Sequence, residues 1–318
     1  MPIPEILRDR LRLPVIGAPQ FIVSTPRLVL AQCKAGIVGA FPALNARPVS
    51  QLNDWLAEIT GELAAYQRAN PGQKVAPYAV NQIVHSSNNR LEEDVALCVK
   101  HKVPIIITSL RPPAEVVSAV HGYGGVVFHD VINLRHAEKA AAQGVDGIIA
   151  VCAGAGGHAG LLSPFALVKQ IREVYAGTII LAGAMSTGAD VLAACAMGAD
   201  LAYMGTRFIA TEEGNAPAEY KQMLIDSAAE DIVYTSLFSG VNGNYLRGSI
   251  ARAGLDPDQL PQADKTKMNF GTGGNTAAKA WRDIWSAGQS VSGIHAIESV
   301  EALVARMQRE YVAALAGL

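Results

Sequence analysis

The sequence predicts an α/β fold: a (β/α)8 barrel of the TIM type, with a smaller, mainly helical insertion domain after strand eight. Short, nearly continuous apolar segments alternate with amphipathic segments from residue 15 to about residue 210. Apolar strands separated by helices are typical of parallel sheets that are covered on both faces. Eight such units in series favour a closed barrel, although an open doubly wound sheet has the same local pattern.

The expected strands are short apolar runs that end in small or polar residues. They are Val15–Pro19, Ile37–Phe41, Val75–Asn81, Pro104–Ser109, Gly125–His129, Asp146–Val151, Thr178–Gly183 and Leu201–Gly205. The expected helices between them are Leu28–Ala35, Gln51–Arg68, Leu91–His101, Ala114–His121, Leu134–Gln143, Phe165–Val174 and Ala189–Met197. Several of these helices are followed by glycine, which readily adopts the left-handed conformation that ends a helix.

The β/α pattern divides the chain into three parts. Residues 1–215 form the predicted barrel, residues 216–284 the insertion, and residues 285–318 a segment that returns to the barrel. The insertion is richer in polar residues, glycine, asparagine and proline, and it is longer than a usual βα loop. Such a segment is typical of a lid or a substrate-binding domain.

We expect the insertion to cover the C-terminal face of the barrel, with one helix near Pro217–Ala229. Tyr245 and Trp285 are aromatic residues that either line the pocket or pack between the domains. The amphipathic segment Val300–Leu315 is expected to be the eighth outer helix.

Composition excludes several classes of partner. The net charge is -2 at pH 7 and the sequence pI is near 6.4, which gives no basic surface for nucleic acid or an anionic membrane. No segment approaches the ~18 uninterrupted apolar residues of a membrane helix, and the first residues contain no apolar signal segment. The four cysteines form no CxxC pair. We therefore expect a cytoplasmic protein with reduced thiols; the sequence leaves its oligomeric state open.

The segment Val145–Gly160, VDGIIAVCAGAGGHAG, is the most informative feature of the chain. An apolar strand leads directly into a glycine-rich loop whose backbone can approach a flat ligand closely. His158 is the only side chain between Ala153 and Gly160 that can move a proton near pH 7. We therefore predict that His158 is catalytic; the alternative is a structural histidine whose ring is hydrogen-bonded to backbone groups of the loop.

Two further turns predict a phosphate site. The active site of such a barrel lies at the C-terminal ends of its strands, and phosphate commonly binds after strands seven and eight. Those positions hold Gly183-Ala184 and Met204-Gly205-Thr206. Glycine lets backbone N–H groups approach a phosphate, and the Thr206 hydroxyl is a further donor. The alternative is that these glycines only form tight turns.

Other candidate groups are weaker. His129-Asp130 ends the fifth strand and either reaches the pocket or forms a structural hydrogen-bonded pair, and Cys152 is more typical of a core thiol than of a nucleophile. No HxH, HExxH or paired-carboxylate spacing appears, so we predict no metal site. A barrel with a phosphate site, a glycine loop and one histidine but no metal cluster requires an organic cofactor, and FMN fits this description.

These segments resemble the nitronate monooxygenase family, also called 2-nitropropane dioxygenases. The resemblance lies in AGGHAG at 155–160, LAGAMSTGADVLAACAMGAD at 181–200, YMGTRFIATEE at 203–213, GNYLR at 243–247 and IWSAGQ at 284–289. It implies a TIM-barrel flavoprotein that holds FMN, with a smaller domain inserted after the eighth strand.

The resemblance also implies roles for individual residues. His158 matches the active-site histidine, Asn81 an asparagine beside the flavin, and Gly156 a glycine under the isoalloxazine ring. The phosphate-binding residues match Gly183, Ala184, Gly205 and Thr206, and the first flavin-contacting loop matches Pro19, Gln20 and Phe21. The chain departs from the family at Ala184, where a second glycine is common, at Gln20, where methionine is frequent, and at 151–154, where acidic or glutamine residues are usual.

The resemblance implies an FMN-dependent oxidoreductase that oxidises alkyl nitronates or nitroalkanes with O2 to a carbonyl compound and nitrite. Three alternatives remain open. They are an NAD(P)H-dependent quinone or enoyl-thioester reductase on the same barrel, a flavin-free isomerase or lyase acting on a phosphorylated metabolite, and a barrel that binds a phosphate ligand without catalysis.

Overall fold

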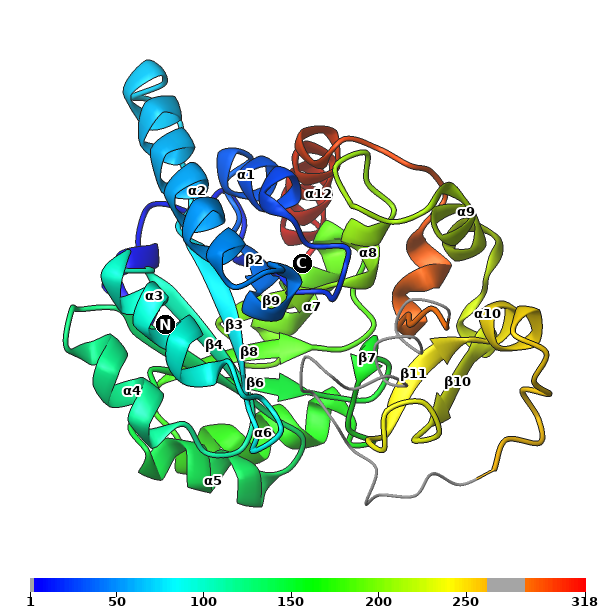
Figure 1. Cartoon of the computed structure of the whole chain (residues 1–318). Coiled ribbons are helices and arrows are strands. Elements are labelled where there is room, and N and C mark those ends of the chain that lie inside the picture. The colour runs from blue at the N-terminus through cyan, green and yellow to red at the C-terminus, as the bar shows by residue number, and fades with distance from the viewer. Residues whose placement is uncertain (1–2, 262–283) are drawn as a thin grey trace.

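Eight parallel strands form a closed barrel in the computed structural model, which describes residues 3–261 and 284–318 (Figure 1). The strands follow the order β1-β9-β8-β6-β5-β4-β3-β2. Their bounds are β1 Val15–Gly17, β2 Gly39–Pro42, β3 Tyr78–Val84, β4 Ile105–Leu110, β5 Val126–Val131, β6 Gly147–Val151, β8 Thr178–Ala182 and β9 Leu201–Met204.

The two end strands of this order, β1 and β2, close the barrel. Ile16 and Val38 form a parallel bridge, and the backbone N–H of Gly17 donates to the carbonyl oxygen of Val38 at 2.7 Å. The predicted (β/α)8 barrel is therefore confirmed, and the open doubly wound sheet is wrong.

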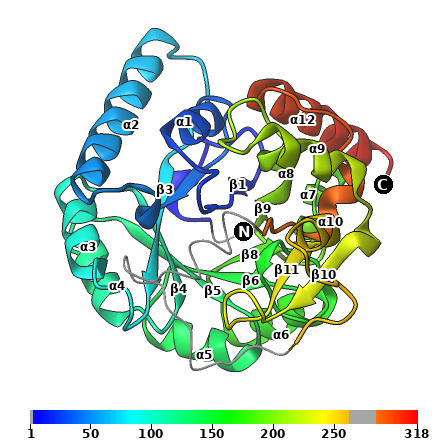
Figure 2. The same ribbon diagram turned by 45° about the vertical axis from the view of Figure 1, so that its right-hand side comes forward.

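Helices of the described chain surround the barrel (Figure 2). They are α1 Pro26–Lys34, α2 Ser50–Ala69, α3 Leu91–Lys100, α4 Ala114–His121, α5 Leu134–Ala142, α6 Pro164–Val174, α7 Gly188–Ala196 and α12 Val300–Ala316. The last of these, α12, packs against both α7 and α1, so it occupies the eighth outer position that its sequence predicts. Among the described residues, no helix has the length and apolar character needed to cross a membrane.

Side chains that point into the barrel form an apolar core with a polar upper layer. The core includes Ile107 on β4, Phe128 on β5 and Ile149 on β6, all fully buried. Side chains alternate along a strand, so a residue two positions further along points the same way. Ser109 and Asp130 therefore lie directly above the apolar core, at the C-terminal ends of their strands.

The insertion combines helices with a small antiparallel sheet. After α8 (Thr206–Ile209), the chain forms α9 Ala218–Asp226, η3 Ala229–Asp231, β10 Ile232–Thr235, β11 Gly243–Leu246 and α10 Arg247–Arg252. The glycine-rich loop contributes a third strand, β7 (Gly157–His158), which pairs with β11. The sequence did not predict this sheet. Residues 262–283 of the predicted insertion lie outside the described residues. The remaining short helices are η1 Glu5–Leu7, η2 Ala43–Asn45 and η5 Gln289–Gly293.

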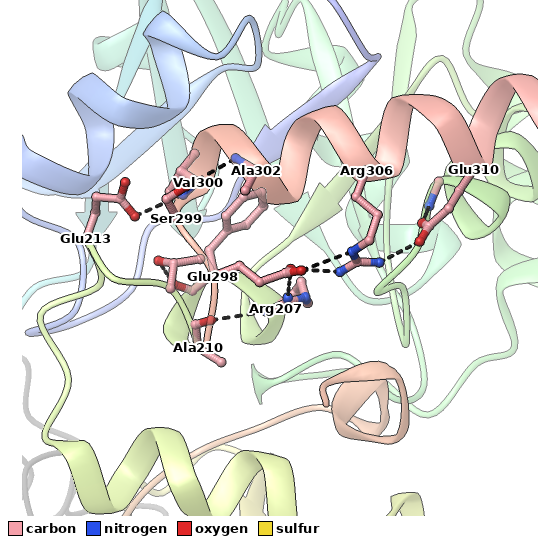
Figure 3. A network of polar contacts seen from close by, with 12 residues as sticks. Arg207, Ala210, Glu213, Glu298, Ser299, Val300, Ala302, Arg306 and Glu310 are labelled. Carbon is pink, nitrogen blue, oxygen red and sulfur yellow. Dashed lines mark hydrogen bonds and ion pairs between the residues drawn. The ribbon is translucent and has the colours of Figure 1, made fainter. Parts of the chain in front are cut away.

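A chain of ion pairs connects the end of the barrel to the last helix (Figure 3). Arg207, which is 1% exposed, forms an ion pair with Glu298 at 2.6 Å. Glu298 also pairs with Arg306 at 3.0 Å, and Arg306 pairs with Glu310. The chain leaves the barrel next to Arg207 and returns at Glu298, so this network joins the two ends of the intervening segment.

Helix α12 also contacts α7 without an intervening side chain. A Cβ atom on Gly188, the first residue of α7, would lie 1.8 Å from the carbonyl oxygen of Met307. The N–H of Gly188 donates to Glu310 Oε2 at 2.8 Å. The two helix backbones can approach this closely only because residue 188 has no side chain.

We predict that Gly188→Ala destabilises the protein by about 3 kcal/mol, because overpacking of this kind forces backbone movement. Gly61→Ala is the matched control. Gly61 lies inside α2, and a methyl group added there would have no atom within 4 Å, so the same substitution should stabilise the protein by up to about 1 kcal/mol. Urea unfolding of both variants measures the difference. Equal stability of the two variants would contradict the proposed docking of α12.

Candidate active site

A cavity of about 590 Å³ lies at the C-terminal ends of the barrel strands. All the residues that the sequence analysis assigned to the site line this one cavity. They are Pro19, Gln20, Phe21, Asn81, Gly156, His158, Gly183, Ala184, Met204, Gly205 and Thr206. The structure therefore brings together residues from separate segments of the chain.

The insertion forms one wall of the cavity. Tyr220, Tyr234 and Asn242 line it, together with Trp285 from the returning segment. The rings of Tyr220 and Trp285 are stacked with their centroids 4.8 Å apart. Tyr245 is 1% exposed and does not line the cavity. Of the two roles that the sequence left open, Trp285 takes the pocket position and Tyr245 the packing position.

His158 is held at the cavity by the sheet between the loop and the insertion. Residues 157–158 pair with residues 243–244 of β11, where Gly243 faces His158. A Cβ atom on Gly243 would lie 2.8 Å from the carbonyl oxygen of Gly157, so this pairing also depends on a glycine. Burial lowers the pKa of His158 to about 4, and the imidazole is therefore neutral at pH 7.

Ser239 of the insertion holds the imidazole of His158 in place. Its Oγ lies 2.8 Å from His158 Nε2 and 3.0 Å from the carbonyl oxygen of Val241. A hydroxyl can both donate and accept a hydrogen bond, so it can pair with Nε2 in either tautomer of the ring. The contact therefore fixes the orientation of the imidazole at the cavity.

The glycines of the loop also permit close packing within the chain. A Cβ atom on Gly156 would lie 2.7 Å from Thr206 Oγ1 and 2.8 Å from the backbone nitrogen of Gly288. The N–H of Gly288 donates to Thr206 Oγ1 at 2.9 Å, which leaves the hydroxyl hydrogen of Thr206 for another acceptor. The packing of the returning segment at Gly288 therefore leaves no room for a side chain at position 156, whether or not a ligand also approaches Gly156.

The two turns predicted to bind phosphate lie side by side at the cavity, because β8 and β9 are neighbouring strands. Ala184 has a left-handed backbone with φ 50°, a conformation that a glycine adopts with less strain. Within the described part of the chain, the N–H groups of Ala184 and Met185 have no hydrogen-bond partner. Arg207 points away from the cavity to Glu298.

Asp130 lies at the base of the cavity, whereas its neighbour His129 points away from it. Ser109 Oγ donates to Asp130 Oδ2 at 2.5 Å, and Asn81 Nδ2 donates to Ser109 Oγ at 2.9 Å. Burial raises the pKa of Asp130 to about 6. His129 Nδ1 lies 2.8 Å from Thr108 Oγ1 outside this group. The sequence left the role of His129-Asp130 open, and the structure separates the two residues.

Two other sequence-based interpretations concern reactivity. Cys152 is fully buried, and burial raises the pKa of its thiol to about 12, as befits a core thiol. In the described ranges, no group of three or more His, Cys, Asp or Glu side chains is placed to hold a metal ion.

Sequence reasoning did not find Ser239, gave Ser109 no role and left the role of Asp130 open. Strand alternation could have assigned Ser109 and Asp130 to the cavity, because each is two positions beyond a buried core residue, Ile107 and Phe128. No local signal identifies Ser239, since its contact with His158 spans 81 residues of sequence.

The sequence profile of the nitronate monooxygenase family matches residues 9–310. The chain belongs to this family. Family membership makes it an oxidoreductase, as the resemblance implied.

A curated relative and two solved structures are similar to the chain over most of its length. The chain is 28% identical to a nitronate monooxygenase of Paraburkholderia phytofirmans, over 93% of this chain and 92% of the relative. Among solved structures, it is similar to nitroalkane oxidase from Streptomyces ansochromogenes, with a TM-score of 0.81, 22% identity, and coverage of 99% of this chain and 100% of the other. It is also similar to the enoyl reductase domain of MlnA from Bacillus amyloliquefaciens, with a TM-score of 0.70, 16% identity, and coverage of 100% and 98%. The two structural likenesses concern the fold.

Proposed function

We propose that this oxidoreductase binds FMN and oxidises alkyl nitronates with O2 to a carbonyl compound and nitrite. The observation that carries the proposal is the convergence of His158 and the two adjacent turns after β8 and β9 on one cavity. When bound, FMN would supply the electron acceptor that the side chains lack.

The residues of the cavity fit FMN. Ala184 and Met185 offer backbone N–H groups without partners in the described chain, and Thr206 offers a hydroxyl hydrogen. Backbone donors at such turns are suited to a phosphate. Phe21, Asn81 and Gly156 lie elsewhere along the same cavity, where a flat ring could be held. Gln20 contributes an Oε1 atom that is buried without a partner in the described residues.

His158 would act on the proton chemistry of the substrate. A nitronate is already an anion, so it needs only orientation, to which a hydrogen bond from a positioned side chain contributes. A neutral nitroalkane must first lose its α-proton, and a neutral imidazole can accept it. Because burial lowers the pKa of His158 to about 4, the base form is present at neutral pH.

A reductase acting on a quinone or an enoyl thioester is the second candidate. The likeness to an enoyl reductase domain supports it at the level of the fold. Anaerobic reduction of the purified flavoprotein separates the two functions. We expect nitronate to reduce the flavin faster than NADH or NADPH does. Reduction by a nicotinamide but not by nitronate would favour the reductase, and a colourless protein that takes up no FMN would favour the flavin-free isomerase or lyase.

Gly205→Ala should weaken FMN binding without affecting the fold. A Cβ atom on Gly205 would lie 3.4 Å from its nearest neighbours, Ala18 Cβ and Gln20 Nε2, which is ordinary contact distance. The added methyl should therefore hinder only the approach of a phosphate. We expect a rise of about tenfold in the dissociation constant of FMN, equivalent to about 1.4 kcal/mol, and an unchanged unfolding midpoint of the apoprotein.

Flavin fluorescence titration measures this binding. Gly183 is less suitable for the experiment, because a Cβ there would lie 2.9 Å from the carbonyl oxygen of Ala153 and would strain the fold itself. Unchanged FMN affinity in Gly205→Ala would show that the phosphate binds elsewhere.

His158→Asn should keep FMN and lose about 10²–10⁴ in the rate of flavin reduction by a neutral nitroalkane, because no other group of the loop can accept the α-proton. Preformed nitronate should be affected less, since only a hydrogen bond is lost, worth about 1.5–3 kcal/mol to a charged group. Rapid-mixing reduction with each substrate measures the two rates. Wild-type rates with both would show that His158 is structural.

A further inference from the structure

Asp130 is an unusual residue for the base of this cavity, because no described side chain there balances a negative charge. No lysine, arginine or glutamate of the described residues lines the cavity. The other titratable groups that line it are His136 on α5, His158 on β7, Tyr203 on β9, and Tyr220 and Tyr234 of the insertion. A buried carboxylate without a cationic partner is strongly disfavoured relative to the neutral acid.

The hydrogen bonds of Asp130 leave it only partly satisfied. Oδ2 accepts from Ser109, whereas Oδ1 is buried and accepts no hydrogen bond from any described residue. Asn81 fixes the direction of this chain, because its Nδ2 also donates to the carbonyl oxygen of Ile107, which can only accept. Ser109 therefore receives a hydrogen bond from Asn81 and gives its own hydrogen to Asp130.

We propose that Asp130 is held un-ionised at the base of the cavity and donates a hydrogen bond to an acceptor atom on the ring of the bound flavin. The inference rests on the proposed function, which supplies the flat ligand. An un-ionised carboxyl has one O–H, and an acceptor on the ring would satisfy it. A donor at the ring also tunes the electronic properties of a flavin. Asp130 would therefore act on the cofactor, whereas His158 would act on the substrate.

The direction of the pKa shift agrees with this geometry. Burial raises the pKa of Asp130 to about 6, while the hydrogen bond from Ser109 acts in the opposite direction. Burial, and to a smaller extent the charge of Asp130, raises the pKa of Tyr203 well above 10. Tyr203 therefore stays neutral at the pH values at which Asp130 titrates. An acceptor atom that binds only the neutral carboxyl would raise the pKa of Asp130 further in the complex.

The dissociation constant of FMN as a function of pH tests the proposal. If only un-ionised Asp130 binds the ring, the wild-type protein should bind FMN about tenfold or more less tightly at pH 8 than at pH 6. Asp130→Asn is the matched control, because its amide is nearly isosteric, can donate, and does not ionise. The phosphate of FMN itself titrates near pH ~6, and the difference between the two proteins removes that common contribution.

Ser109→Ala provides the second variant. Loss of its hydrogen bond to the carboxylate should move the wild-type transition to higher pH, which a merely structural role of Asp130 would not do. Identical pH profiles of FMN affinity for the wild type and Asp130→Asn would overturn the proposal. A wild-type affinity that rises from pH 6 to pH 8, relative to that of Asp130→Asn, would also overturn it. FMN binding in none of the proteins would overturn the proposed function and, with it, the ligand named here.

Discussion

The ion pair between the buried Arg207 and the partly exposed Glu298 is the interaction on which the rest of the structure depends. Arg207 directly follows the turn after β9, and Glu298 precedes Ser299, the N-cap of the helix α12 that occupies the last outer position of the barrel. Removing Glu298 would leave the buried charge of Arg207 without its partner, which is strongly destabilising. The pair therefore fixes the point where the chain leaves the barrel relative to the point where it returns. The turn that carries Gly205 and Thr206 is held in place by the same contact.

The site is a composite of barrel and insertion. The barrel supplies the base of the cavity and the two turns, whereas the insertion supplies the strand that pairs with β7 and the hydroxyl that holds His158. Each contribution alone lacks part of the cavity wall. The position of His158 is consequently a property of the docked insertion, and a local change in the insertion can reach the imidazole through backbone pairing.

Few charged side chains line the cavity, and no described lysine, arginine or glutamate is among them. Burial disfavours the charged forms of both His158 and Asp130, so it lowers the pKa of the imidazole and raises that of the carboxyl. Between about pH 4 and pH 6, both groups are neutral hydrogen-bonding side chains. Because no described lysine or arginine lines the cavity, hydrogen bonds from side chains and backbone N–H groups would bind an anionic substrate there.

The sequence by itself determined the barrel, its eight strand–helix units and the residues from 19 to 206 that meet at the cavity. This was possible because parallel strands have a strong local pattern, and because in this fold every strand ends at the same face. Only the tertiary structure decided the rest. The β7–β11 pairing, the contact between Ser239 and His158, and the packing of Gly156 on Gly288 join segments tens of residues apart, and such contacts leave no periodic trace in the sequence. The separate directions of His129 and Asp130 follow from strand alternation. The raised pKa of the Asp130 carboxyl follows from its burial in a cavity that no described lysine or arginine lines.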